Sequence, residues 1–301
     1  MSTKTMLIVA LVVALGVSVG AYAFYRWREV KLRELGVTPS SGGAATNPPP
    51  PTALFNLPGT GLYKTYFESG GERIKAIVYI PKRWNRAYVI LIHGLNSRKE
   101  KWVKEGVMEE LADAGFCCIA FDLPLHGERG RLQSLAQLPD VILNGSQNIV
   151  DLTDMIRSSG ITEIYAIGRS LGSIVLSVAL GRGAHIKKAE LLLASANFTY
   201  LYYHSAIAQD PRARSELQTW VQSKIARQID PLYALPNYRG AAHLHCGTQD
   251  RILPPQSCVY AYDALTSASE KKLFWHNVGH RMPKELFLKE AIEFFKGSSS
   301  P

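Results

Sequence analysis

Short apolar runs alternate with amphipathic stretches along most of the chain after about Leu54. Runs rich in Ile, Val and Tyr are typical of strands, and stretches with apolar residues three and four positions apart are typical of helices. The pattern predicts strands over Ile74–Ile80, Ala87–Ile92, Cys117–Phe121, Glu163–Ile167, Glu190–Ala194, Ala242–Cys246 and Lys271–Trp275, and helices over Lys101–Ala114, Asn148–Ser159, Leu171–Leu180 and Lys284–Phe295. Because this alternation favours a mostly parallel central sheet with helices on both faces, we expect an α/β fold.

The alternation is interrupted between Asn197 and Gly240, where the sequence contains no convincing strand. Two helices are predicted in this stretch, over about Thr199–Gln209 and Ala213–Gln228. A helical insertion between two strands of a sheet can cover one end of the sheet. The sequence therefore predicts a small helical cap over residues 197–240.

The amino-terminal run Met6–Phe24 contains nineteen residues without a charge, which is long enough to span a thin bilayer as a helix. Lys4 and the small-residue pattern Ala21-Tyr22-Ala23 are typical of a cleavable signal peptide, after which the domain would be exported. Four basic residues between positions 26 and 33 resist transfer across a membrane, and they favour an uncleaved anchor. We therefore expect residues 1–37 to form a single-pass membrane anchor with its basic flank.

Residues 38–53 are rich in Pro, Gly, Ser and Thr and carry no charge, so they cannot build a hydrophobic core. We predict a linker in this segment and a folded domain over residues 54–301. The four prolines at positions 48–51 favour a semi-rigid spacer, and a polyproline recognition segment is the alternative.

Charge and cysteine content narrow the classes of partner. The net charge is +9 at neutral pH, but no basic block stands out after residue 53, so a solvated surface explains the charge better than a nucleic-acid site.

Cys117, Cys118, Cys246 and Cys258 show neither a CxxC motif nor a Cys/His metal spacing. We expect buried free thiols, with a disulfide only if the domain is exported.

The stretch GRSLGS, Gly168 to Ser173, sets Ser170 between two glycines where a predicted strand meets a predicted helix. Glycine and serine are common in ordinary turns. A serine on a sharp strand-to-helix turn is typical of a catalytic nucleophile, however, and Gly168 and Gly172 would relieve crowding beside it. Because a serine hydroxyl needs a positioned base and a third group that orients the base, two partners are expected downstream.

Two downstream residues have the required chemistry and position. Asp250 follows the predicted strand Ala242–Cys246, and His280 follows the last predicted strand after a short loop. This order and these strand-end positions are those of the nucleophile, acid and histidine of α/β-hydrolases, which residues Leu54–Phe295 resemble. The resemblance covers about four fifths of the chain and implies that Ser170 attacks, His280 transfers the proton and Asp250 orients His280.

Alternatives to two of these assignments stay open at this stage. Asp230 or Asp263 could replace Asp250, because an Asp after glycine in a loop is commonly a turn residue. His276 lies close enough to His280 to be its main competitor.

The resemblance also implies an oxyanion hole. The stretch LIHGL, Leu91 to Leu95, is similar to the strand-end HG motif of the family, which makes the main-chain N–H of Leu95 one donor and that of Leu171 the second. His93, His126 and the segment Asp122–Glu128 are interpreted as structural support.

These features predict a serine hydrolase that cleaves carboxylic esters or related small acyl substrates through an acyl-enzyme, and they imply no cofactor or metal. Tyr200, Tyr202 and Tyr203 are a guess for the acyl pocket, since a helix packing face explains them at least as well. A peptidase or amidase of the same fold is one alternative, and a non-catalytic binding module is another.

Overall fold

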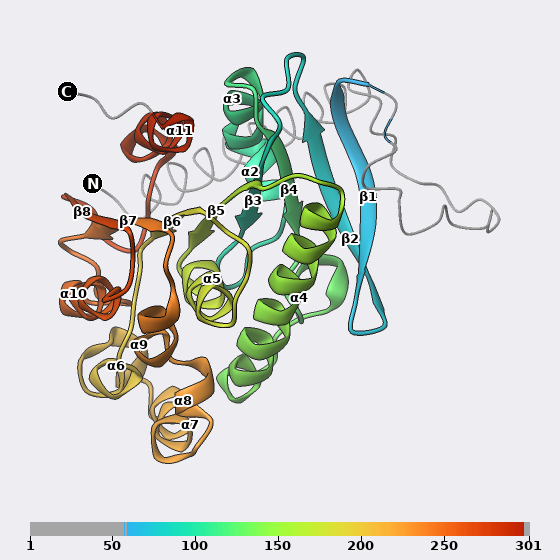
Figure 1. The fold of residues 1–301 in the computed structure, drawn as a ribbon. Coiled ribbons are helices and arrows are strands. Elements are labelled where there is room, and N and C mark those ends of the chain that lie inside the picture. Colours follow the sequence, from blue (N-terminus) through green and yellow to red (C-terminus); the bar gives the residue numbers. More distant parts are fainter. Residues whose placement is uncertain (1–56, 58, 298–301) are drawn as a thin grey trace, which may run out of the picture. The chain divides into compact units, whose positions relative to one another are not determined.

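The computed structural model describes residues 57 and 59–297, which form one eight-stranded sheet with the order β1-β2-β4-β3-β5-β6-β7-β8 (Figure 1). The strands are β1 Gly61–Ser69, β2 Glu72–Ile80, β3 Ala87–Ile92, β4 Cys117–Phe121, β5 Glu163–Arg169, β6 Lys188–Leu192, β7 Ala241–Gly247 and β8 Glu270–His276. Neighbouring strands from β4 to β8 pair in parallel, whereas β2 pairs in the antiparallel sense with β1 and with β4. The mostly parallel sheet predicted from the sequence is confirmed.

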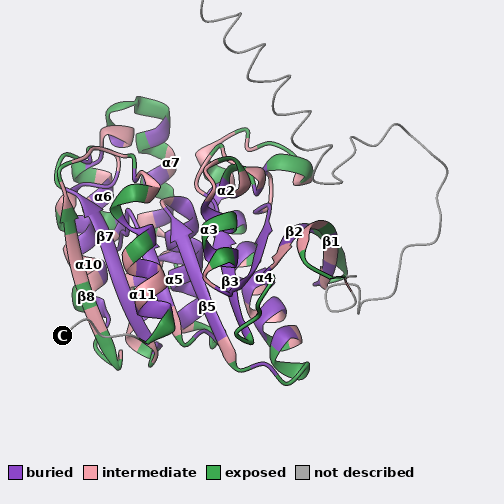
Figure 2. Ribbon diagram, turned by 90° about the horizontal axis from the view of Figure 1, so that it is seen from above, coloured by how far each residue is buried: buried purple, intermediate pink, exposed green. Residues whose placement is uncertain are grey.

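The central strands are buried on both faces (Figure 2). Every residue of β3 and of β4 is buried, because both strands consist of apolar residues apart from the small polar atoms of Cys and Tyr side chains. A strand with this composition needs cover on both sides. Helices provide that cover in two layers.

One layer contains α2 Glu100–Lys104, α3 Val107–Asp113 and α11 Leu288–Lys296, and the opposite layer contains α4 Leu138–Ser158, α5 Leu171–Gly181 and α10 Pro255–Ala264 (Figure 1). Each helix layer packs on one face of the sheet and forms a hydrophobic core with it. Successive residues of a strand point alternately into one core and the other. In β7, for example, Leu244 faces the α5 core, while His243 and His245 lie on the α11 face.

Several boundaries differ from the sequence-based prediction. The helix predicted over Lys101–Ala114 is divided, because Gly106 adopts φ +72° and ends the first turn. The helix predicted over Asn148–Ser159 starts ten residues earlier, at Leu138, where Pro139 occupies its first turn. Strand β6 lies two residues before its predicted position. Strand β1 and helix α10 were not predicted.

The segment predicted as a cap contains only helical elements, α6 Phe198–His204, α7 Pro211–Gln222, α8 Ala226–Ile229 and α9 Pro231–Ala234, with short 3₁₀ turns between them. Polar side chains cap the amino-terminal ends of some of these short helices. Asp210 accepts a hydrogen bond from the Ala213 amide, and Pro211 occupies the first turn of α7. Whether the segment covers the active site stays a prediction.

The cysteine prediction needs one correction. Cys117 and Cys118 are buried free thiols, as expected. Cys246 and Cys258 are instead joined as a disulfide, with Cα atoms 6.4 Å apart. The first turn of α10 packs against the end of β7, and this contact brings together two thiols that the sequence places twelve residues apart.

The predicted anchor, residues 1–37, and the predicted linker, residues 38–53, lie outside the described residues. Within residues 59–297, no helix combines the length and the apolar character needed to cross a bilayer.

Candidate active site

Ser170 occupies a sharp turn between β5 and α5, with φ +54° and ψ −119°. This conformation is strained for a residue with a side chain, and the neighbouring glycines make room for it. A Cβ atom on Gly168 would lie 2.5 Å from the carbonyl oxygen of Gly172, and a Cβ atom on Gly172 would lie 2.3 Å from that of Ile92. The glycines flanking the serine are therefore required by close main-chain contacts.

The structure brings Ser170, His280 and Asp250 together. The Ser170 Oγ atom lies 2.8 Å from His280 Nε2, and His280 Nδ1 lies 2.7 Å from Asp250 Oδ2. Asp250 is buried, whereas the His280 side chain is 26% exposed. The arrangement joins a hydroxyl, an imidazole and a carboxylate in one hydrogen-bonded chain.

The carboxylate of Asp250 is fixed by the loop that follows β7. Its Oδ1 atom accepts hydrogen bonds from the amides of Ile252 and Leu253, both at 2.9 Å. These bonds occupy one oxygen and leave Oδ2 directed at the His280 ring. The loop thereby sets the orientation of the imidazole as well.

Of the three competing residues, Asp263 lies exposed on α10, and the other two have hydrogen-bond partners of their own. Asp230 accepts hydrogen bonds from the amides of Asn197, Phe198 and Leu232, so it caps the start of α6 and of α9. The His276 Nε2 atom lies 2.9 Å from His245 Nδ1. The geometry therefore selects Asp250 and His280 as the partners of Ser170.

Two main-chain N–H groups lie beside the serine. Leu95 follows Gly94, whose Cβ position would be 3.4 Å from the Ser170 Cβ, and Leu171 begins α5. Among the described residues, neither the Leu95 nor the Leu171 N–H donates a hydrogen bond. The Leu171 N–H also stands at a helix amino terminus, where the helix dipole favours negative charge. Both groups are available to an anionic oxygen on a substrate.

Buried polar residues support the Leu95 loop from behind. His93 Nδ1 lies 2.8 Å from the Gly94 oxygen, and His93 Nε2 accepts a hydrogen bond from the Leu123 amide. Burial lowers the pKa of His93 to about 4, which keeps the ring neutral and able to accept. His126 Nδ1 similarly lies 2.8 Å from the Pro124 oxygen. The interpretation of both histidines as main-chain supports is confirmed.

Sequence reasoning missed the lysine of this support. The Lys99 ammonium is buried and lies 2.6 Å from Asp122 Oδ2 and 2.8 Å from Glu128 Oε2. Burial alone would lower the pKa of Lys99, but the hydrogen bonds to Asp122 and Glu128 raise it above its ordinary value. The same contacts hold the pKa of Asp122 below its ordinary value against the effect of burial. The segment Asp122–Glu128, interpreted as structural, is thus tied to the loop after β3.

The three tyrosines guessed for the acyl pocket all lie on α6. The Tyr200 ring stacks on His204 with centroids 4.2 Å apart, and the Tyr202 ring lies 4.8 Å from that of Tyr203. Tyr203 is 64% exposed. These contacts are those of a helix surface, so a pocket role for the tyrosines stays a prediction.

Comparisons with known proteins agree with this fold. A family model described as the alpha/beta hydrolase family matches residues 89–286. No curated protein sequence matches the chain.

Solved structures of hydrolases are similar at low sequence identity. The acylaminoacyl peptidase of Pyrococcus horikoshii gives a TM-score of 0.64 at 15% identity, over 83% of this chain and 44% of the peptidase. The acetyl xylan esterase of Paenibacillus sp. R4 gives a TM-score of 0.63 at 17% identity, over 80% of this chain and 85% of the esterase. A puromycin-hydrolyzing peptidase of Mycobacterium tuberculosis gives a TM-score of 0.60 at 13% identity, over 78% of this chain and 38% of the peptidase.

This chain therefore spans less than half of the length of the two peptidases and corresponds to most of the esterase. Identities this low establish a shared fold. Since the family model covers about two thirds of the residues, and the sheet and its helices have the matching architecture, the chain belongs to the α/β-hydrolase family.

Proposed function

We propose that this protein is a serine hydrolase that cleaves carboxylic esters or related acyl compounds. The observation that carries the proposal is the hydrogen-bonded chain from Ser170 through His280 to Asp250, with Ser170 on a strained turn. A serine hydroxyl acts as a nucleophile when a base removes its proton and a third group orients the base.

In the proposed reaction, the Ser170 oxygen attacks the carbonyl carbon of the substrate while His280 Nε2 takes the hydroxyl proton. The resulting oxyanion faces the Leu95 and Leu171 N–H groups, which stabilise its charge. His280 then gives the proton to the departing alcohol, and an acyl-enzyme forms. A water molecule then attacks the acyl carbon while His280 takes its proton, and His280 gives that proton to the departing Ser170 oxygen as the acid is released. Asp250 stabilises the positively charged imidazole throughout.

The test is a matched panel of esters, thioesters and aminoacyl amides, combined with labelling by a fluorophosphonate and identification of the labelled peptide. Ester hydrolysis with the label on Ser170 supports the proposal. The similarity to acylaminoacyl and puromycin-hydrolyzing peptidases makes amide cleavage the second activity to measure. Faster cleavage of the aminoacyl amides than of the esters would assign the protein as a peptidase or amidase.

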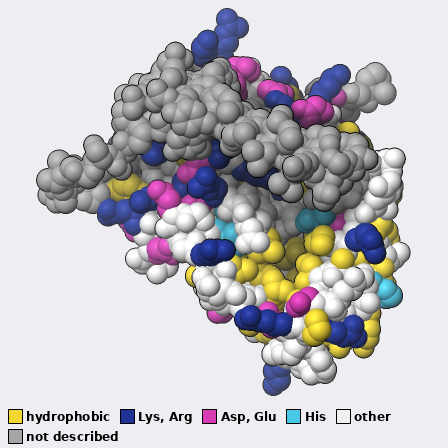
Figure 3. Space-filling view, turned by 180° about the vertical axis from the view of Figure 1, so that it is seen from behind, with side chains coloured by type: hydrophobic (Ala, Val, Ile, Leu, Met, Phe, Trp, Pro, Cys, Tyr) yellow, Lys and Arg dark blue, Asp and Glu magenta, His cyan; other side chains and the backbone are white. Residues whose placement is uncertain are grey.

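The length of the acyl chain provides a further prediction. Segment 197–240 consists of short helices, and two of the exposed large aromatic side chains of the described residues, Tyr203 and Tyr233, belong to it. Hydrophobic side chains also gather on the lower part of the face seen in Figure 3. Each methylene that becomes buried contributes about 0.8 kcal/mol, but only while it contacts the protein. A segment this short is expected to bury a short or medium acyl group.

We therefore expect kcat/KM for p-nitrophenyl esters to rise from acetate, to peak at short or medium chain length, and to fall for long chains. Initial rates across the series, taken below the critical micelle concentrations, measure this profile. A steady rise through palmitate would contradict the prediction and would indicate a lipase.

The amino-terminal segment gives another prediction. Deleting residues 1–37 is expected to release an active domain into the supernatant, whereas the full chain should sediment with membranes, because the linker separates the anchor from the folded domain. Fractionation followed by an esterase assay measures both. A full-length chain that stays in the supernatant would contradict the anchor, and a mature chain that starts at Phe24 would establish cleavage of a signal peptide.

A further inference from the structure

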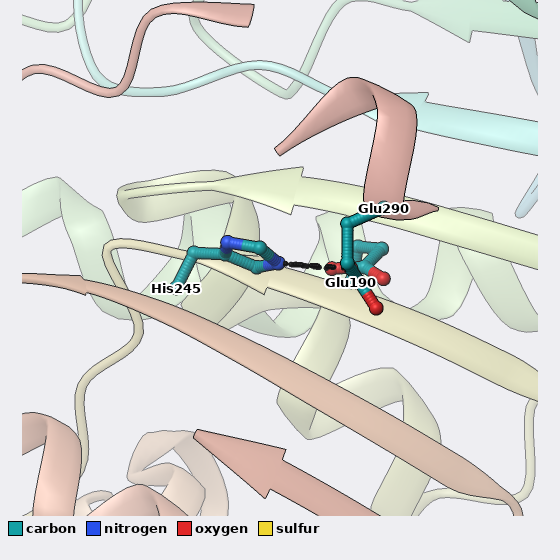
Figure 4. A group of neighbouring side chains, drawn as sticks. All are labelled: Glu190, His245 and Glu290. Atoms are coloured by element: carbon teal, nitrogen blue, oxygen red, sulfur yellow. Dashed lines mark hydrogen bonds and ion pairs between the residues drawn. The ribbon is translucent and has the colours of Figure 1, made fainter. Parts of the chain in front are cut away.

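A group of ionisable side chains lies within the hydrophobic layer between the sheet and α11, apart from Ser170, His280 and Asp250 (Figure 4). Glu190 comes from β6, His245 from β7 and Glu290 from α11, and the three side chains converge. Glu190 is 0% exposed and His245 is 1% exposed, and the Glu290 side chain is partly exposed. The proposed hydrolysis uses none of them.

Burial of Glu190 requires a compensating positive charge. A carboxylate that loses its hydrating water destabilises the fold unless it is paired or hydrogen-bonded. Within the described part of the chain, neither oxygen of Glu190 accepts a hydrogen bond, although both are buried. The contacts of these oxygens are with His245 Nε2 at 3.0 Å and His243 Nδ1 at 3.6 Å.

The spacing of the converging atoms fits a common ion. His245 Nε2 lies 3.0 Å from Glu190 Oε2 and 3.2 Å from Glu290 Oε2, and one ligand atom from each residue lies within 4.8 Å of the others. Ligands bonded to one ion at about 2.0–2.2 Å, with angles of about 90–110°, lie about 2.8–3.6 Å apart. Both measured distances to His245 fall in this interval.

The surroundings orient the two outer ligands. His245 Nδ1 lies 2.9 Å from His276 Nε2, a hydrogen-bond distance at which His245 Nδ1 can donate its proton to His276. In that tautomer the lone pair of His245 Nε2 points toward the two carboxylates. Glu290 uses its other oxygen to contact His243 Nδ1 at 2.6 Å. Metal-binding histidines and carboxylates are commonly held by such outer partners.

We propose that Glu190, His245 and Glu290 bind a divalent transition-metal ion, with Zn²⁺ as the best match. One imidazole nitrogen and two carboxylates, without sulfur, form a ligand set suited to such ions, and the two carboxylates balance the charge of the ion. The ion would join β6 and β7 to α11. Where His245 Nε2 carries a proton before binding, the ion displaces that proton into solvent.

The proton is the competing occupant of this space. A protonated His245 would neutralise the carboxylates without any metal, and the two states differ in measurable metal content.

The test uses the full chain, purified with a tag that contains no histidine and without chelators. Elemental analysis by plasma mass spectrometry is expected to find about one Zn²⁺ per chain after dialysis. Treatment with EDTA should lower the melting temperature, and added Zn²⁺ should restore it.

Three variants make the test specific to the site. Glu290→Gln keeps the shape of a partly exposed ligand, and it is expected to weaken Zn²⁺ binding by about 100-fold or more. His276→Ala, which alters only the outer partner of His245, should weaken binding about 10- to 100-fold. Glu285→Gln is the matched control. Glu285 is exposed and lies five residues from Glu290, and its substitution removes the same charge. Its Zn²⁺ affinity should equal that of the wild type.

Metal-free wild-type protein whose melting temperature does not respond to Zn²⁺ would overturn the proposal and assign the cluster to protons. Equal Zn²⁺ affinity of the wild type and Glu290→Gln would overturn it as well. Metal content of the wild type decides the question even where a variant fails to fold. Ester hydrolysis is measured separately, so a failure of the proposed enzymatic activity leaves this test intact.

Discussion

Replacing Ser170 with alanine is expected to lower kcat/KM for ester hydrolysis by about 10⁴-fold or more and to abolish labelling by a fluorophosphonate. The only side-chain hydrogen bond of Ser170 in the described structure joins its hydroxyl to His280. Its main-chain bonds to Leu192 and Ser173 do not involve that hydroxyl. Since alanine has a Cβ atom like that of serine, it meets the same strain in the turn. The fold should therefore persist while the nucleophile is lost.

Initial-rate measurements and circular dichroism on the same samples test this expectation. Ser158→Ala, which removes an exposed hydroxyl at the end of α4, is the matched control and should retain full activity. His280→Ala should lose a comparable amount of activity. A Ser170→Ala variant that keeps most of the hydrolysis, with the wild-type sensitivity to fluorophosphonate, would refute the nucleophile assignment.

Replacing Lys99 with methionine is expected to lower the free energy of unfolding by about 3–5 kcal/mol. Methionine retains much of the apolar stem but removes the ammonium that lies 2.6 Å from Asp122 Oδ2. Asp122 keeps its hydrogen bonds from the amides of Lys99 and Glu128, yet its buried charge loses its positive partner. Breaking one side of a buried ion pair is costly because the remaining charge stays desolvated.

Urea denaturation measures the loss, with Lys101→Met as the control. The Lys101 side chain is 50% exposed and lies 3.7 Å from Glu105, so its removal should change the free energy of unfolding by less than about 1 kcal/mol. Equal losses in the two variants would contradict the proposed role of Lys99.

The effect of Lys99→Met should also depend on pH. The folded protein lowers the pKa of Asp122 below 3.8, so the pair contributes stability above that pH. The contribution is lost as the pH falls through the lowered value. The difference between the wild type and Lys99→Met should therefore shrink in strong acid and be full near neutral pH.

Strands β3 and β4 were predicted to the residue. Arg86 and His93 bound the apolar run of β3, and Asp122 ends that of β4. The early start of α4 was not predicted, and the missed turns contain Pro139 and Gly145, two residue types that disfavour a helix interior. Proline is tolerated in the first turn of a helix. Gly145 allows close packing, since a Cβ atom there would lie 3.0 Å from a Leu123 methyl and 3.1 Å from a Val175 methyl.

The site itself could be predicted from local context to a large extent. Ser170, Asp250 and His280 each follow a strand of a parallel sheet, and the carboxyl ends of such strands meet at one edge. Lys99 and the Glu190 cluster gave no such signal. Their partners come from separate elements, and a single buried Glu or His within an apolar run looks the same in sequence whether or not another charge lies opposite.

The hydrogen bond between Ser170 and His280 joins the end of a central strand of the sheet to the loop after an edge strand. Ser170 follows β5 in the centre, whereas His280 follows β8, an edge strand with no fully buried residue. Edge strands open at lower free energy than central ones, so β8 can fray while β5 stays hydrogen-bonded. Such local opening would carry His280 away from an intact serine. Inactivation and global unfolding are then separable events. Amide hydrogen exchange in β8 would report on the local opening that causes inactivation.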